Sequence, residues 1–430
     1  MDGFDVVVRV ARLGLSASGE GTGMLELYVK RTADAYDIDV GMIVLPEQVV
    51  LQAADPNAPR SDVVRVTPGI FRLDQVAELK RTLVAIESGM SADDACGRLD
   101  SIAGQRQRWP WWARVLGVAL FAAGFAPRVV ATWGEVGAAA ILGLLMGLLV
   151  VSTAGTKIEG LVPFLGAFGV TVLGLTVLSD LATRTGVTLL VIPALFIVVP
   201  GDTLSAAAGE LLSGRFTPGV VRLMLGVFIL GLIVVGIVAA ADVTGHLDAL
   251  SEDLPQPDLP YGVILAGWVV FSAGLVLAFN AEPVVFLWLV PTVVVTFLIQ
   301  QGATRVVGSV LGTLAAGAVL GAFANLLDAI SRRPPRLILV LGGFFVLTVG
   351  GLGVRGVTAF FGGDPVSSLM ILPTSAFRCP PWLSPWPSES SSASAGDHSS
   401  PTEPRSPGGI SRQSRASDMK WSSALVTKVE

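Results

Sequence analysis

The feature that most constrains this chain is a series of long apolar runs that fills its middle. Residues 112–372 consist mostly of apolar stretches separated by short polar breaks. A helical stretch of about 20 apolar residues crosses the hydrocarbon core of a bilayer. Lipid offers no hydrogen bonds, and a helix satisfies its backbone groups within one segment. The sequence therefore predicts an α-helical polytopic membrane protein.

We expect about ten membrane spans in this region. Their approximate bounds are 112–127, 133–152, 161–179, 187–201, 219–241, 261–279, 284–300, 306–326, 337–353 and 356–372. Only 15% of the chain is charged, against about 25% in soluble proteins, and the deficit falls in these runs. Five regions are therefore expected: a soluble α+β domain at 1–108, a five-span repeat at 112–241, an acidic extracytoplasmic loop at 242–260, a second five-span repeat at 261–372, and a disordered Ser/Pro-rich tail at 373–430.

Three short matches indicate that the apolar region is duplicated. GVALFAAG at 117–124 resembles GWVVFSAG at 267–274, LGAF occurs at 165–168 and 320–323, and LLVIPALFIVVPG at 189–201 resembles ILVLGGFFVLTVG at 338–350. The matches keep the same order and an offset of about 150 residues. Because five spans is an odd number, the second copy would enter the membrane from the opposite side. The pattern thus predicts an inverted repeat, which is common in secondary transporters.

The fourth apolar run ends abruptly. The sequence VVPGD places Pro200 and Gly201 at the end of the run and Asp202 directly after them. Proline removes a backbone donor and glycine weakens a helix, so we expect the helix through Val199 to end there. Asp202 is then expected to cap a new helix beginning at Thr203, whose N-terminal end carries a partial positive charge suited to a carboxylate.

An inverted repeat also predicts where a substrate would bind. In such transporters the site lies near the midplane, where the broken helices of the two halves meet. Here the site is expected where Pro200–Asp202 meets Val349–Arg355, with Asp202 carrying a proton or holding an ammonium group. The candidate substrate and proton path comprises Pro200, Gly201, Asp202, the Thr203 turn for a carboxylate, Arg355 as a second anchor, and Glu210 and Glu282 as further proton carriers.

An alternative explanation of the same stretch stays open. The segment could be an ordinary inner loop at the membrane surface. Asp202 would then be a solvent-facing helix cap, and Glu210 would be solvated. Charged groups cost about 3 kcal/mol at the bilayer centre, so their depth decides between the two explanations.

Several function classes are unsupported by the residues present. Histidines occur only at His246 and His398, both in polar segments, so we expect no metal cluster, no cofactor and no His-dependent catalysis. The sequence GLGVRG at 351–356 lies between two expected spans and is interpreted as a hinge, because it lacks the βαβ context of a nucleotide site. The net charge of −5 argues against nucleic acid as a partner. Whether the chain forms homo-oligomers stays open.

The N-terminal region has patterns of helix and strand. Residues 4–33 have helical spacing interrupted by GEGTG at 19–23, and residues 39–46, 48–55 and 61–69 read as strands. Apolar residues from Val76 to Ile86 predict a helix, and Ser91 is expected to cap another. Arginines favour a cytoplasmic N-terminus, and with ten spans the C-terminus would also be cytoplasmic, in a multi-pass protein of the plasma (inner) membrane.

Three stretches resemble one known family. They are RVARLGLSASGEGTGMLELYVKRTADAYDIDV at 9–40, WWARVLGVALFAAGFA at 111–126 and LFIVVPGDTLSAAAGELLSG at 195–214. Together with their order and spacing over residues 5–372, they resemble the bacterial threonine/serine exporter family, which is similar to paired exporters whose five-span halves are separate chains. The second half departs from the family pattern, because TVGGLGVRG stands where the family often has Pro-Gly.

The resemblance implies export of threonine or serine driven by a proton gradient. We therefore expect a secondary transporter, not an enzyme, that works by proton antiport with alternating access, with amino acids, protons and the lipid bilayer as its partners. Two alternatives stay open. The scaffold could export another small metabolite such as a dicarboxylate, for which Arg355 and Arg222 would matter more than Asp202. The chain could instead be a membrane-anchored regulatory or sensory protein.

Overall fold

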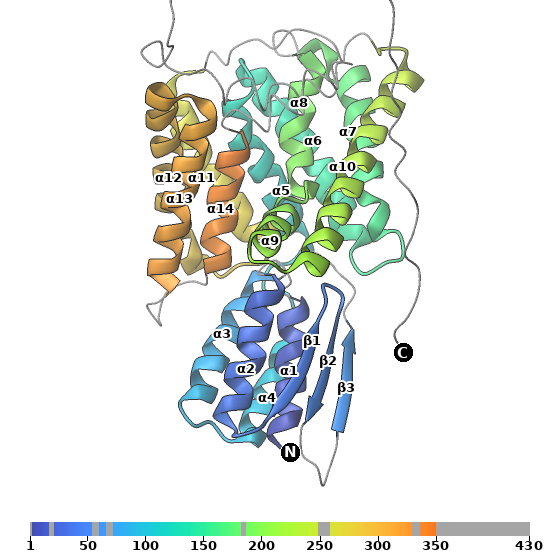
Figure 1. Ribbon diagram of the computed structural model, residues 1–430. Helices are drawn as coiled ribbons and strands as arrows, with labels where there is room; N and C mark the ends of the chain where they lie inside the picture. Colours follow the sequence, from blue (N-terminus) through green and yellow to red (C-terminus); the bar gives the residue numbers. More distant parts are fainter. Residues whose placement is uncertain are drawn as a thin grey trace, which may run out of the picture. The chain divides into compact units, whose positions relative to one another are not determined.

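The computed structural model describes seven stretches of the chain (Figure 1). They are residues 2–16, 21–53, 60–65, 72–181, 186–247, 259–328 and 336–349. The tail expected at 373–430, the span expected at 356–372, and Arg355 with its GLGVRG segment lie outside them. Most of the acidic loop expected at 242–260 also lies outside them.

The N-terminal segment, residues 2–104, contains four helices and one small sheet. The elements are α1 (Gly3–Ser16), α2 (Thr22–Ala35), β1 (Val40–Val44), β2 (Gln48–Ala53), β3 (Arg60–Arg65), α3 (Leu73–Glu87) and α4 (Ala92–Ala103). The sheet is antiparallel in the order β1-β2-β3. The predicted strands and helices are confirmed, and the Ser91 side chain accepts a hydrogen bond from the Asp94 backbone N–H at the start of α4.

Helix α1 forms the centre of this segment because it is apolar on two faces. Val7 and Ala11 lie in one buried cluster with Leu51 of the sheet. Val6 and Val10 lie in a second cluster, shared with α3 and α4. Asp5, Arg9 and Arg12 share one polar face of FDVVVRVARLGL, and the apolar residues around the rest of the helix supply both clusters. The sheet and the α3–α4 pair therefore cover opposite sides of α1.

Two groups of long apolar helices follow. The first group consists of α5 (Trp111–Phe125), α6 (Trp133–Thr153), α7 (Val162–Thr176), α8 (Gly186–Leu195), α9 (Gly201–Leu212) and α10 (Phe216–Thr244). The second group consists of α11 (Tyr261–Ala278), α12 (Phe286–Val307), α13 (Ser309–Asp328) and α14 (Arg336–Val349). Short 3₁₀ turns flank several of them, including Phe196–Val198 after α8 and Pro283–Val285 before α12.

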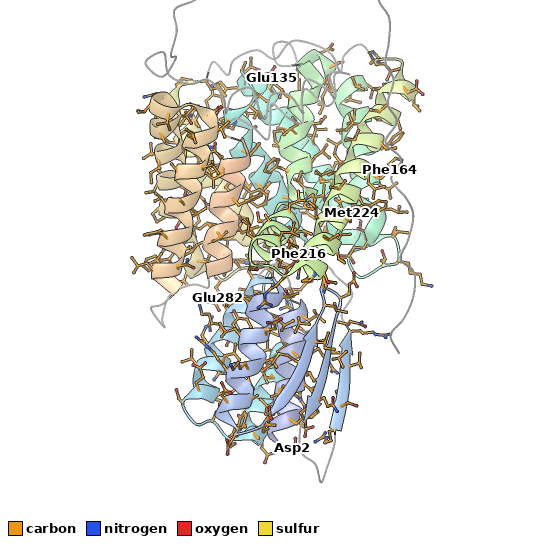
Figure 2. All side chains as sticks on the ribbon, viewed as in Figure 1. Asp2, Glu135, Phe164, Phe216, Met224 and Glu282 are labelled. Atoms are coloured by element: carbon orange, nitrogen blue, oxygen red, sulfur yellow. The ribbon has the colours of Figure 1, made fainter. Side chains whose placement is uncertain are left out.

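Within the described residues, six helices are long and apolar enough to cross a membrane, or seven if the bent α8–α9 pair forms one span. Their outward faces are apolar: Phe216 and Met224 of α10 are 67% and 61% exposed and project from the helical part (Figure 2). A protein in water rarely exposes such a continuous apolar surface. The fold is thus consistent with a polytopic membrane protein. The expected spans at 112–127 and 337–353 correspond to the shorter helices α5 and α14, so the count of ten stays a prediction.

The two groups meet most closely where α5 crosses α11. A Cβ atom placed on Gly124 would lie 2.2 Å from the Phe271 backbone nitrogen, and one on Gly274 would lie 2.3 Å from the Phe121 backbone nitrogen. Gly117 likewise lies against Gly274, and Gly124 against Gly267. Later residues of α5 lie against earlier residues of α11, so the two helices run antiparallel. Small residues allow this approach, as in many membrane helix pairs.

The same pattern of helix contacts recurs in both groups. In the first group α6 contacts α5, α7 and α8, and in the second α12 contacts α11, α13 and α14. Glycines bring α6 onto α5 as well, since a Cβ on Gly143 would lie 2.7 Å from the Ala122 Cβ and one on Gly147 would lie 2.8 Å from the Val115 carbonyl oxygen. α6 and α12 therefore each pack against the helices before and after them in the chain and against one further helix.

An aromatic cluster fills the space around the α5–α11 crossing. Phe121 lies 4.6 Å from Phe271 and 5.0 Å from Phe345 of α14, measured between ring centroids. Phe125 stacks on Phe196, which follows α8, at 4.7 Å. These rings belong to one buried core with residues from both groups. The two groups therefore share an interior instead of forming separate cores.

Substituting Gly124 tests the crossing. We expect Gly124→Ala to lower the stability of the protein by about 1–3 kcal/mol, because its Cβ would overlap the α11 backbone. Thermal unfolding in detergent, followed by loss of the monodisperse chromatographic peak, measures the change. Gly231→Ala on α10 is the matched control, since a Cβ there meets no atom within 4 Å, and it should leave stability equal or raise it by up to about 1 kcal/mol. Equal behaviour of the two variants would contradict the close crossing.

Candidate functional site

The helix broken at Pro200 is the centre of the candidate site. α8 and its 3₁₀ extension meet α9 at an angle of 62°. Pro200 has φ −78° and ψ 54°, and the Gly201 N–H donates to the Val199 carbonyl at 2.8 Å. These values describe an inverse γ-turn centred on a single residue. The chain therefore changes direction within one residue and resumes a helix at once.

The prediction that Asp202 caps the new helix is wrong. α9 begins at Gly201, and its N-cap position is Pro200, with no side-chain cap hydrogen bond. The Leu204 N–H donates to the Pro200 carbonyl at 3.0 Å, so the turn supplies the first helical acceptor one residue earlier than expected. Asp202 consequently lies inside the first turn, where a carboxylate still interacts favourably with the helix dipole. The Thr203 hydroxyl lies 3.4 Å from Asp202 Oδ2.

The break, at the end of the expected segment 187–201, contacts α14, which covers the described part of the expected segment 337–351. A Cβ on Gly201 would lie 2.1 Å from Cε1 of Phe344 in α14. Only glycine fits between the turn and this ring without a shift. On the same side, Phe196 lies 5.5 Å from Phe345 between ring centroids. The structure thus brings Pro200, Gly201 and Asp202 beside α14, whereas Arg355 lies outside the described residues.

Glu210 lies at the other end of α9 and is buried, with 4% of its surface exposed. Its Oε1 accepts a hydrogen bond of 2.8 Å from the backbone N–H of Thr22, at the start of α2. Arg222 of α10 places Nε 3.2 Å from the same oxygen. That Nε forms no hydrogen bond to the described part of the chain, so charge holds the pair, not an aligned bond. The alternative in which Glu210 is solvated is therefore wrong.

Arg222 lies on α10 beside the last turn of α9, where it pairs with Glu210. Arg222 is 6% exposed, which gives its charge more effect on its neighbours than a surface arginine has. In the sequence it was weighed only for the dicarboxylate alternative. Its place opposite α9 depends on how α10 folds back, which residue spacing alone does not reveal.

Glu282 is not brought together with Asp202. It precedes α12 and forms an ion pair with Arg81 of α3, at the border between the N-terminal segment and the helical part (Figure 2). Its neighbour Asn280, which breaks the run between two predicted spans, has a left-handed backbone with φ 55°. Their partners could not be predicted from the sequence, because Arg81 and Asp74 lie in α3, about 200 residues earlier, and Trp109 lies just before α5.

Comparisons with known proteins decide the family. The model of the ThrE family, described as "Putative threonine/serine exporter", matches residues 5–244, more than half of the chain. The chain belongs to this family. It is also 27% identical over 380 residues to a "Probable threonine/serine exporter" of Mycobacterium tuberculosis (strain ATCC 25618 / H37Rv), with 84% of this chain and 70% of the relative covered. No solved structure matches the chain.

Membership of the threonine/serine exporter family confirms the resemblance seen in the sequence. The activity named for the family and for the relative is transport, not catalysis. Because the relative covers 84% of the chain, the similarity extends beyond α10 into the second helix group. Family membership and the apolar helices together support a transmembrane exporter. Among the described residues, no group of three or more His, Cys, Asp or Glu side chains could hold a metal ion.

The Glu210–Arg222 pair makes a testable contribution to stability. Arg222→Met should destabilise the protein by about 3–5 kcal/mol, because it leaves the buried Glu210 charge uncompensated. Adding Glu210→Gln should recover part of this loss, since no buried charge then remains. Thermal unfolding of the single and double variants in detergent measures both changes. A double variant whose loss equals the sum of the single losses would contradict a coupled pair.

Proposed function

We propose that this protein is a secondary transporter that exports threonine and serine across the plasma membrane by proton antiport. In this proposal α5–α14 and the segments beyond α14 form ten spans in two inverted halves. The N-terminal segment is a soluble cytoplasmic domain, and both termini are cytoplasmic. The observation that carries the proposal is the contact of the broken α8–α9 helix with α14, Gly201 lying against Phe344, in a chain of the threonine/serine exporter family.

The antiparallel α5–α11 crossing supports the inverted repeat. The helices that cross are the ones related by the sequence match at an offset of 150 residues. Gly117 faces Gly274, which matches Gly124, and Gly124 faces Gly267, which matches Gly117. A twofold axis in the membrane plane relates two equivalent helices in this way. Alternating access then follows if the halves rock around the crossing.

The broken helix offers groups suited to a zwitterion. The first turn of α9, at Gly201–Thr203, lies at the positive end of the helix dipole, which attracts a substrate carboxylate. Asp202 in the same turn is half-buried and can bind either the ammonium group or a proton. A protonated carboxyl binds the ammonium group more weakly, because it has lost its negative charge. Competition of this kind couples proton and substrate. In this proposal Glu210 and Glu282 do not carry the proton, because each is engaged in an ion pair.

Proton antiport would give export a useful driving force. One pH unit across the membrane corresponds to about 1.4 kcal/mol per proton, or about a tenfold concentration ratio of an exchanged substrate. No nucleotide motif is present in the sequence, so a gradient is the simplest energy source.

Uptake into inside-out vesicles tests the proposal. Vesicles that contain the protein and have an acidic interior should accumulate labelled threonine, and collapse of the gradient should abolish the accumulation. Asp202→Asn should lower gradient-driven uptake at least tenfold, because the amide cannot carry the proton. Gly209→Ala on the same helix is the control, since a Cβ there meets no atom within 4 Å.

Three outcomes would redirect the proposal. Full uptake by Asp202→Asn would keep the exporter and move the proton to another group. Uptake of succinate instead of threonine would favour the dicarboxylate alternative, in which Arg222 holds the substrate. Absence of uptake for all of these, together with a signalling activity of the N-terminal segment, would favour the membrane-anchored regulatory alternative.

A further inference from the structure

The N-terminal segment contacts both helix groups, at two separate places. One contact is with α9 and the start of α10 in the first group. The other is with the turn between α11 and α12 in the second group. A body attached to both groups at once resists their relative movement. The two contacts differ sharply in construction.

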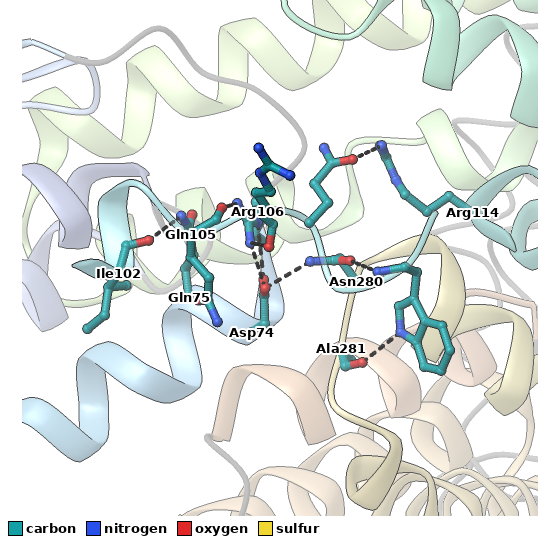
Figure 3. A network of polar contacts seen from close by, with 11 residues as sticks. Asp74, Gln75, Ile102, Gln105, Arg106, Arg114, Asn280 and Ala281 are labelled. Atoms are coloured by element: carbon teal, nitrogen blue, oxygen red, sulfur yellow. Dashed lines mark hydrogen bonds and ion pairs between the residues drawn. The ribbon is translucent and has the colours of Figure 1, made fainter. Parts of the chain in front are cut away.

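The contact with the α11–α12 turn is buried and fully bonded (Figure 3). The Leu73 N–H at the start of α3 donates to the Phe279 carbonyl at 3.2 Å. Asn280 Nδ2 donates to Asp74 Oδ2 at 2.8 Å, and Arg72 holds both oxygens of Asp74. Asp74 and Asn280 are 1% and 3% exposed. Bonds of this kind are strong because they are charge-assisted and shielded from water.

The chain that leads into α5 joins the same contact. The Trp109 N–H donates to Asn280 Oδ1 at 3.0 Å, and its indole Nε1 donates to the Ala281 carbonyl at 3.0 Å. The turn, the α3 start and the base of α5 are thus bonded together. Since α5 and α11 also cross at their glycines, this whole assembly forms a single rigid base.

The contact with α9 is smaller and incompletely bonded. It consists of the Thr22 N–H to Glu210 Oε1 hydrogen bond and an ion pair of 2.6 Å between Arg215 Nη1 and Glu26 Oε1. The ion pair is about one third exposed on both sides, so it contributes little. Within the described part of the chain, Glu210 Oε2 and the Thr22 hydroxyl are buried without hydrogen-bond partners. Unsatisfied buried groups raise the free energy of this arrangement relative to one in which they are solvated.

We infer that the N-terminal segment is a brace anchored on the α11–α12 turn, and that its contact with α9 opens and closes during the transport cycle. Glu210 is the positioning residue of this contact. It caps α2 from the broken helix, because the α2 N-cap position is Gly21 and has no side-chain cap of its own. Movement of α9 therefore removes the cap from α2 and releases the first helix group. The inference rests on the proposed transport function.

Reversible crosslinks at the two contacts test the brace. Cysteines replace the ion-paired residues in two full-length variants, Glu26→Cys with Arg215→Cys and Arg81→Cys with Glu282→Cys. The background carries Cys96→Ala and Cys379→Ser; Cys96 is buried, and burial raises the pKa of its thiol, so it reacts little. A reducible bifunctional thiol reagent closes each pair, and threonine uptake into inside-out vesicles is measured before closure, after closure and after reduction.

A brace of this kind predicts that the two crosslinks have different effects on threonine uptake. Crosslinking positions 26 and 215 should lower threonine uptake at least tenfold relative to the same variant before closure, and reduction should restore it. Crosslinking positions 81 and 282 should change uptake less than twofold on the same comparison. Equal effects of the two crosslinks, or a loss of uptake only when positions 81 and 282 are crosslinked, would overturn the inference.

Crosslinking rates separate this inference from the proposed function. An imposed proton gradient should change the rate at 26–215 and leave the rate at 81–282 constant, which a gel measures without any transport. If the unmodified protein transports no threonine, the proposed function fails, and a gradient-dependent rate at 26–215 alone still supports the brace. Constant rates at both pairs would contradict the brace whether or not threonine is transported.

Discussion

The close antiparallel contact between α5 and α11 is the interaction on which the rest of the structure depends. Backbone meets backbone there because Gly117, Gly124, Gly267 and Gly274 have no side chains. Lipid provides little hydrophobic drive between helices, so such packing holds the two groups together. The crossing also gathers Phe121 and its neighbours into one aromatic core. The position of α14 beside the α8–α9 break follows from this shared core.

The break at Pro200 adds a polar feature to an otherwise apolar interior. The γ-turn lets helix α9 begin directly at Gly201, and Gly201 lets the first turn approach Phe344. In the last turn of the same helix, Glu210 connects α9 to Arg222 and to α2. One short helix therefore carries the candidate site at its first turn and the contact with the N-terminal segment in its last turn. Any movement of α9 therefore changes both the candidate site and the contact with the N-terminal segment.

The sequence predicted what depends on local pattern. Apolar runs, strands and the Ser91 cap are all encoded within a few residues, and the prediction of a repeat rests on glycines of α5 that recur in α11. The cap at Asp202 was predicted wrongly, because the γ-turn at Pro200 depends on backbone angles that composition does not fix. The partners of Glu210 and Glu282 could not be predicted either, since Thr22 and Arg81 lie about 190 and 200 residues away.

We propose that the first turn of α9 lines a site that opens alternately to the two sides of the membrane. The most direct measurement is the reaction of Thr203→Cys, in the background without native cysteines, with a membrane-impermeant thiol reagent in right-side-out and inside-out vesicles. Alternating access predicts that the Thr203→Cys variant is labelled from both sides of the membrane and that saturating threonine slows the labelling from each side. Labelling from one side only, with or without threonine and a proton gradient, would contradict alternating access at the broken helix.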